Sequence, residues 1–128
     1  MISFKNLIIS ESNSIDKDSG NLSVFNILNK ISPLAFPVTM NRIVISIILE
    51  RAIEDDGGGY IELLIKQEGQ PDYNKIVQFS FTDLHIAYLT IRINGFVING
   101  PGKIEFIAKL GETEIKNTIS VVQFGIKI

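Results

Sequence analysis

The amino-acid sequence predicts an all-β protein, folded as a two-sheet antiparallel β-sandwich of about seven to eight strands. The first observation is composition: the 128 residues include 24 Ile, 7 Val and 5 Thr but only 4 Ala. β-branched side chains fit a pleated, half-buried surface better than a helix. The second is that apolar and polar residues alternate with a period of two, and the third is that no long window has the i, i+3, i+4, i+7 spacing of an amphipathic helix.

The first half of the chain contains strand-like segments separated by polar or proline-containing connections. In one of them Ile43, Ile45, Ile47 and Leu49 occupy a single face, which is the period expected of a strand. Prolines remove hydrogen-bond donors and restrict the residues before them, so they favour connections. The segments are residues 2–9, 21–31 and 40–51, and the connections are residues 10–20 and 32–37.

Glycines and prolines divide the second half into further strands. The run 57–59 is three glycines, which carry a large entropic cost in any regular element and therefore predict a break. Gly95 predicts a bulge within a longer strand. Gly111 and Glu112 predict the turn of a hairpin. The segments are residues 60–66, 75–81, 85–98, 103–110 and 113–122, with 123–128 extending the last.

Length and charge narrow the class of protein. A chain of 128 residues is the size of one domain, which we place at residues 1–128. The formal charge of −2 argues against a nucleic-acid partner, which requires a basic face. The chain has no cysteine, and no apolar run approaches the length of a membrane span. We expect a cytoplasmic protein without a membrane partner.

Several turn and strand patterns resemble a known group of proteins. They are the segment Asn-Leu-Ser-Val-Phe-Asn-Ile (21–27), the pair Phe36-Pro37, and residues 91–98 running into Pro-Gly-Lys-Ile-Glu-Phe (101–106). Their order resembles a family of short, single-domain bacterial proteins of unknown function, with immunoglobulin-like or C2-like β-sandwich folds. The resemblance spans nearly the whole chain. It implies a fold, but no activity, substrate or catalytic residue.

Side chains suited to catalysis are scarce. The single histidine, His85, starts a strand in register with Ala87, Leu89 and Ile91, which is typical of a histidine that is half-buried or at the rim of a sheet. No Gly-x-Ser-x-Gly motif is present, and the three glycines at 57–59 are not followed by the Gly-Lys-Ser/Thr of a phosphate-binding loop. We therefore expect no catalytic residues and a protein that is not an enzyme.

Acidic residues are concentrated in predicted connections. If every connection is a simple reversal between antiparallel strands, alternate connections meet at the same end of the sandwich. Carboxylates converging from several loops are what Ca²⁺ requires, although Asp also favours turns for local reasons. The residues assigned to this candidate Ca²⁺ site are Asp16, Asp18, Glu54, Asp55, Asp56 and Asp83. The other interpretation is a solvated acidic rim.

Two predicted strands are apolar on both faces, which a small sandwich does not require. We expect the second face to be covered by a loop or by residues 123–128, or else by another protein. The function that we predict is accordingly a non-catalytic binding or assembly module with a protein–protein surface, self-association included. The alternative is a Ca²⁺-dependent or ligand-binding sandwich that uses the acidic loops. The apolar residues are Ile43, Val44, Ile45, Ile47 and Ile48 in one strand and Ile61, Leu63, Leu64 and Ile65 in the other.

Overall fold

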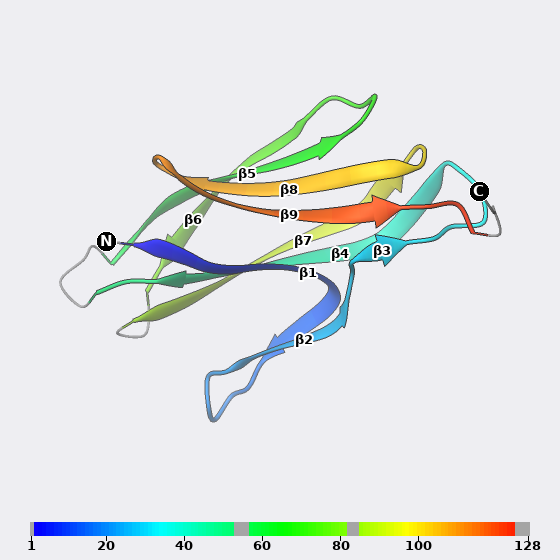
Figure 1. The fold of residues 1–128 in the computed structure, drawn as a ribbon. Coiled ribbons are helices and arrows are strands. Elements are labelled where there is room, and N and C mark those ends of the chain that lie inside the picture. Colours follow the sequence, from blue (N-terminus) through cyan, green and yellow to red (C-terminus); the bar gives the residue numbers. More distant parts are fainter. Residues whose placement is uncertain (1, 53–56, 82–84, 125–128) are drawn as a thin grey trace.

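The computed structural model describes residues 2–52, 57–81 and 85–124. Within these residues the chain forms nine strands in two sheets (Figure 1), so the predicted all-β sandwich architecture is confirmed. No helix occurs in this part of the chain, and hence none that could cross a membrane. The strands are β1 (Ser3–Ile15), β2 (Leu22–Ile27), β3 (Lys30–Ile31), β4 (Val38–Glu50), β5 (Gly58–Gln67), β6 (Tyr73–Ser80), β7 (Ile86–Ile98), β8 (Gly102–Leu110) and β9 (Thr113–Val121).

The strand order differs from the sequence order. Sheet A has the order β2-β1-β4-β7 and sheet B the order β3-β9-β8-β5-β6. All neighbours are antiparallel except β3 and β9, which pair in parallel over two residues. On one side of the sandwich β1 and β9 lie together, and the Asn117 amide donates a hydrogen bond to the Leu7 carbonyl at 2.9 Å. On the other side β6 and β7 are the last strands of their sheets.

The core lies between the two sheets. From sheet A, the predicted face Ile43, Ile45, Ile47 and Leu49 is completely buried. Sheet B contributes its own alternating residues, among which Phe106 is the largest fully buried side chain. The period-two pattern of the sequence therefore identified the inward-facing side of the central strands.

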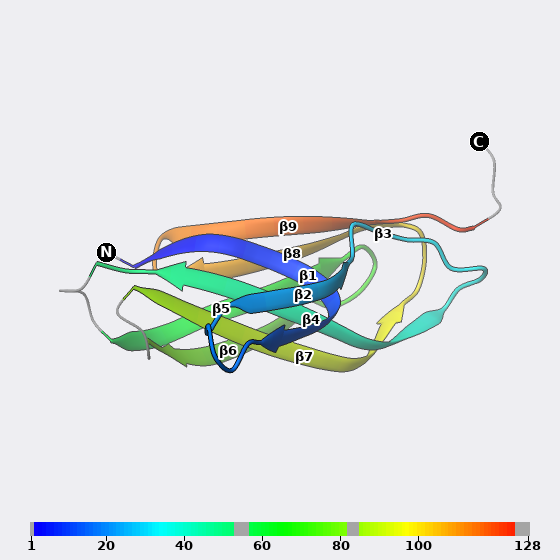
Figure 2. The same ribbon diagram turned by 90° about the horizontal axis from the view of Figure 1, so that it is seen from below.

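The outer face of sheet A is covered by the β1–β2 hairpin. β1 pairs with β4 only as far as Ser10, opposite Val44. Beyond Ser10 the strand leaves β4 and bends away with β2, and Figure 2 shows this hairpin lying across the other strands of sheet A. Asn26 of β2 has a positive φ of 58° at the bend, a conformation that Asn tolerates better than most residues. Val44 and Ser46, on the outer face of β4, are only 0% and 1% exposed.

The side chain of Asn13 holds the hairpin in place. Its amide nitrogen donates to the Ser46 hydroxyl at 2.9 Å and to the Thr90 hydroxyl at 3.0 Å. Ser46 and Thr90 are opposite each other on β4 and β7, whereas β1 neighbours only β4. β1 must therefore cross the outer face of β4 to bring Asn13 to Thr90.

Several predictions about strand boundaries were wrong. Gly58 and Gly59, predicted to lie in a break, begin β5 and pair with Ser80 and Phe79, where a Cβ at position 58 would lie 2.6 Å from the Phe79 carbonyl oxygen. Residues 122–124, predicted to continue the last strand, follow the end of β9 at Val121.

Residues 10–15, interpreted as a connection, belong to β1, because their main chain pairs with β2 and the Asn13 side chain bonds to β4 and β7. Gly95 has a positive φ of 73° but marks no bulge, because the pairing of β4 with β7 keeps the same register on both sides of it. β7 is thus one continuous strand of 13 residues.

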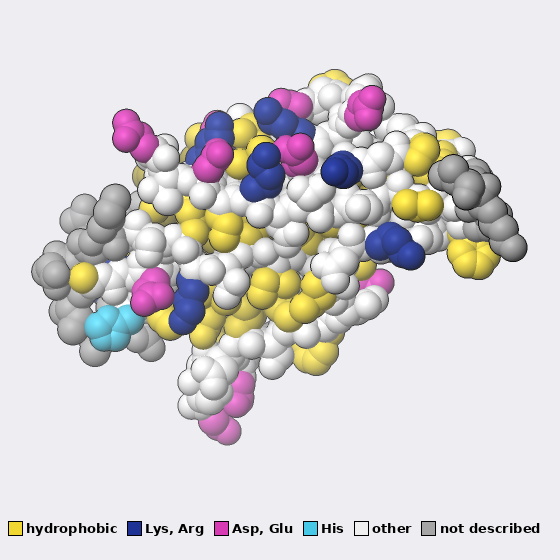
Figure 3. All heavy atoms as spheres, in the orientation of Figure 1, with side chains coloured by type: hydrophobic (Ala, Val, Ile, Leu, Met, Phe, Trp, Pro, Cys, Tyr) yellow, Lys and Arg dark blue, Asp and Glu magenta, His cyan; other side chains and the backbone are white. Residues whose placement is uncertain are grey.

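The outer face of sheet B carries charges of both signs. Glu62 and Glu114 stand on either side of Lys109 in adjacent strands, and Lys116 lies 3.3 Å from Glu105. In the row between these charges Leu64 lies beside Ile107, which is 6% exposed. Figure 3 shows the mixture of basic, acidic and apolar side chains on the upper surface of the molecule. Cross-strand pairing of opposite charges accounts for this face as a solvated surface.

Candidate interaction surface

The first two predicted acidic residues lie in the loop between β1 and β2. One carboxylate oxygen of Asp16 accepts a hydrogen bond from the backbone N–H of Asp18 at 3.2 Å, and the other from the Ser19 hydroxyl at 2.8 Å. The Ser19 bond, followed by that from Asp18, holds the pKa of Asp16 below its ordinary value of 3.8. The Asp16 carboxylate therefore orders its own turn, as Asp commonly does.

This arrangement predicts the titration of Asp16. Because its pKa is lowered in the folded chain, the bonds to the carboxylate stabilise the loop above pH 3.8 and are lost as the pH falls below that value. We expect an NMR titration of the Asp16 carboxyl to give a pKa below 3.8, and the substitution Ser19→Ala to raise it. Ser23→Ala in β2 is the control and should leave the pKa unchanged; an unchanged pKa in Ser19→Ala would contradict the assignment.

The other predicted Ca²⁺ ligands, Glu54, Asp55, Asp56 and Asp83, lie outside the described residues. The chain on either side of them is placed, however. The N–H of Phe81 donates to the Gly57 carbonyl at 2.7 Å, and the N–H of Arg51 to the His85 carbonyl at 2.9 Å. The ends of these two connections thus lie side by side. Among the residues that the structure places, no group of three His, Asp or Glu side chains could hold a metal ion.

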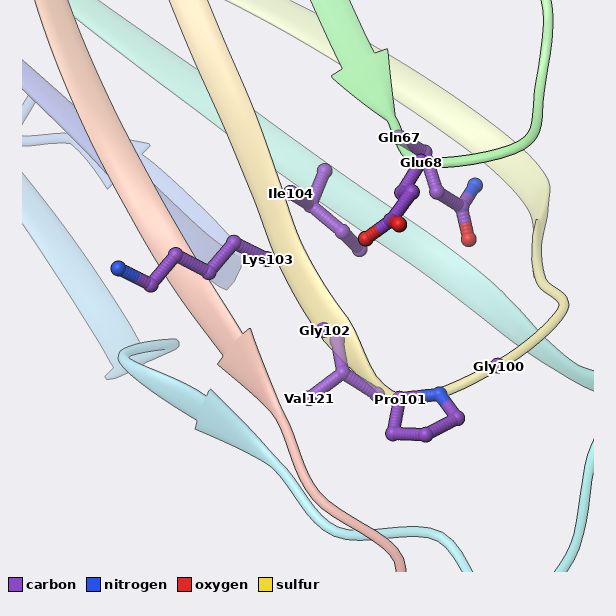
Figure 4. A pocket seen from close by; sticks show the side chains of 8 residues that line it. All are labelled: Gln67, Glu68, Gly100, Pro101, Gly102, Lys103, Ile104 and Val121. Carbon is purple, nitrogen blue, oxygen red and sulfur yellow. The ribbon is translucent and has the colours of Figure 1, made fainter.

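A small hollow of about 190 Å³ lies where β5 ends and β8 begins. Figure 4 shows the Glu68 carboxylate turned toward Ile104, and the Lys103 ammonium group pointing away across β9. Beside Glu68, the Gln67 amide donates to the Val97 carbonyl and accepts from the Asn99 N–H, both at 3.2 Å. Gln67 therefore fastens the turn between β7 and β8, which accounts for a polar residue at the end of a core strand.

A larger hollow of about 710 Å³ opens at the free edge of β7. Its walls are the first residues of β7, the end of β6 and the loop of the β1–β2 hairpin. His85, predicted to be a rim histidine, is exposed here just before β7 begins, so that prediction is confirmed. The hollow therefore lies beside residues 86–89 of β7, with the end of β6 and the hairpin loop on its other sides.

Three of the four sheet edges carry features that oppose pairing with another strand. β3 is only two residues long and is followed by Pro33. β2 contains the positive φ of Asn26. On β6 the exposed side chain of Lys75 shares the inward-facing side with its partner Leu63. A short strand, a local distortion and an inward-pointing charge all discourage edge-to-edge association.

The fourth edge, β7, is long and carries no inward-facing charge, and its one residue with a positive φ, Gly95, lies beyond the segment 86–94. β7 pairs with β4 along one side, and no described strand pairs with the other. Its 13 residues include no lysine and no proline, and its one charged residue, Arg92, faces outward with Val44. The inward-facing residues are Ala87, Leu89, Ile91 and Ile93. An edge this long and apolar can accept a further strand.

The amino-acid sequence does not identify β7 as an edge strand. Alternation assigns residues to faces but does not say which strands are neighbours. One absence in the sequence could have indicated an unprotected edge: residues 86–98 form a long strand-like segment without the lysine or proline that natural edge strands commonly carry. No family model matches this sequence, and comparison with curated proteins and with solved structures gave no significant match.

Proposed function

We propose that the chain is a non-catalytic binding or assembly module that contacts another protein through the free edge of β7. The observation that carries the proposal is the contrast between edges: only on β7 are the inward-facing positions of a long described edge entirely apolar. In strand addition the main chain supplies the hydrogen bonds, while alternate side chains supply specificity. β7 offers Tyr88 and Arg92 on its outer face for that purpose, and both residue types are enriched in protein interfaces.

The wider setting is part of the same proposal. We place the chain among the short bacterial sandwich proteins that it resembles, with immunoglobulin-like or C2-like topology, acting in the cytoplasm and not on nucleic acid or a membrane. The formal charge of −2 and the absence of cysteine support this setting.

An edge-blocking substitution tests the contact. Ile93 on β7 and Val77 on β6 are both partly buried and packed against the core, and both face inward on an edge strand. Ile93→Lys gives β7 the inward charge that Lys75 gives β6, whereas Val77→Lys imposes a similar burial cost on an edge already protected. We expect a photo-cross-linker at exposed Asn94 to capture protein in the parent chain and in Val77→Lys, but not in Ile93→Lys. The material is the purified chain, alone and in cell extract.

A cross-linker at a second position measures the non-specific capture of protein. Thr118 is exposed on β9, toward the opposite end of sheet B from β6 and hence on the other side of the sandwich from β7. Capture from Thr118 equal to that from Asn94, or capture from Asn94 that survives Ile93→Lys in a folded protein, would contradict the proposed function.

A further inference from the structure

We infer that the strand added to β7 is β7 of a second copy of this chain, paired antiparallel across a two-fold axis with Thr90 opposite Thr90. The inference rests on the proposed function and names its partner. It follows from three properties of the strand: the faces that its residues occupy, the position of its single charge, and the symmetry of its apolar residues.

The faces limit the registers that are available. In β7 the even-numbered residues 88–94 lie on the outer face with Val44 and Ser46, and the odd-numbered residues 87–93 face the core with Ile45 and Ile47. A strand that continues sheet A must keep this division, because a shift by one residue exchanges the two faces. Outer residues of one copy must therefore oppose outer residues of the other.

Arg92 distinguishes among the remaining registers. It is the only charged residue of β7, and it lies two positions from Thr90, as Tyr88 does on the other side. Centring the pair on Arg92 would place like charges directly opposite each other, which is destabilising. Centring it on Thr90 places each Arg92 opposite Tyr88 of the other copy, where a guanidinium can pack on an aromatic ring. No other face-preserving register opposes Arg92 to an aromatic residue, since Tyr88 is the only outward-facing aromatic in 86–94.

The inner face agrees with this register. With Thr90 at the centre, Leu89 opposes Ile91 of the other copy, and Ala87 opposes Ile93. Leu89 and Ile93 are only partly buried in the single chain, because β7 is the last strand on its side of the sandwich. Pairing buries Leu89 and Ile93 of both copies. A two-fold contact also pairs the β7 edge of each copy, so no unpaired β7 edge remains to add a third copy and the assembly is a dimer.

A single-cysteine variant reads the register directly. The chain has no cysteine, so Thr90→Cys introduces the only thiol. Directly opposite residues of antiparallel strands have Cα atoms about 4.5–5.5 Å apart, within the range of a disulfide. We expect Thr90→Cys to form a covalent dimer on mild oxidation. Ile76→Cys, at an exposed outer-face position on the β6 edge, is the matched control and should remain largely monomeric.

A residue exchange tests the pairing of Arg92 with Tyr88. Tyr88→Arg alone opposes two arginines, and the two-fold axis produces that clash twice. We expect sedimentation equilibrium to show self-association weakened by about tenfold or more. Adding Arg92→Tyr restores an arginine opposite a tyrosine at both places, so the double variant should associate like the parent chain. Thermal unfolding of each variant confirms that it is folded.

The outcomes separate this inference from the proposed function. A parent chain that stays monomeric at all accessible concentrations, or a Thr90→Cys chain that cross-links no better than Ile76→Cys, overturns the two-fold dimer. Failure of the exchange to restore association overturns the register. If Asn94 still captures a different protein and Ile93→Lys abolishes that capture, the proposed function stands with a heterologous partner. If the chain neither dimerises nor captures another protein from Asn94, both the dimer and the proposed function are rejected.

Discussion

Replacing Phe106 with alanine is expected to lower the free energy of unfolding by about 3–5 kcal/mol. Phe106 is the largest fully buried side chain, in the strand of sheet B that lies between β9 and β5. Its removal loses the transfer free energy of the ring and leaves a cavity that a core between two sheets can fill only partly. Chemical denaturation monitored by circular dichroism measures the change, with the slope of the transition held constant as a check on two-state behaviour.

Phe124→Ala is the matched control, since that phenylalanine is 64% exposed. It should change stability by no more than about 0.5 kcal/mol, the range expected of surface substitutions. Comparable losses in the two variants would mean that the core does not lie between the sheets as described.

Introducing a charge beneath the β1–β2 hairpin should have the second large effect. Val44 is 0% exposed on the outer face of β4, with Ser10 on one side and Arg92 on the other. Val44→Lys buries an ammonium group opposite an arginine, which we expect to cost about 3 kcal/mol or more. The hairpin can relieve that cost by leaving the face of sheet A. Hydrogen exchange should therefore show lost protection for residues 11–15 and 22–27, together with a fall in overall stability.

Val97→Lys supplies the comparison for this variant. Val97 is 45% exposed near the end of β7, away from the hydrogen bonds of Asn13, so its substitution should leave the exchange of the hairpin unchanged. Full protection of the hairpin in Val44→Lys would refute the account of that face.

The core could be predicted from the sequence because it depends on local order along the chain. Ile43, Ile45, Ile47 and Leu49 alternate with other residues, and a strand must place them on one side. The apolar residues on the other side of the same strand also indicated correctly that something covers Val44. The covering element could not be identified, because residues 10–15 are polar and resemble a connection. They form a strand through partners such as Thr90, 77 residues away from Asn13.

The candidate contact surface was less predictable for a related reason. Whether β7 lies at the centre or at the edge of a sheet depends on the order of strands, and the alternation of apolar and polar residues is the same in both cases.

The predicted acidic site could not be derived from the sequence for a different reason. The convergence of the acidic residues requires every connection to be a simple reversal, and of the six named residues only Asp16 and Asp18 lie in the described chain. The hydrogen bonds of Asp16 are local to its turn, and no apolar or polar periodicity encodes them.

The buried hydroxyl of Ser46 has a consequence for how the chain avoids misalignment while folding. Within residues 43–49 β4 is apolar on both sides except at Ser46, so this segment slipped by one residue would still present isoleucine or valine to the core. Hydrophobicity alone thus penalises the error weakly. Ser46 removes the ambiguity, because the slip would turn its hydroxyl into the core and away from the Asn13 amide, leaving a polar group without a partner. The Ser46 side chain thereby distinguishes the two apolar faces of β4.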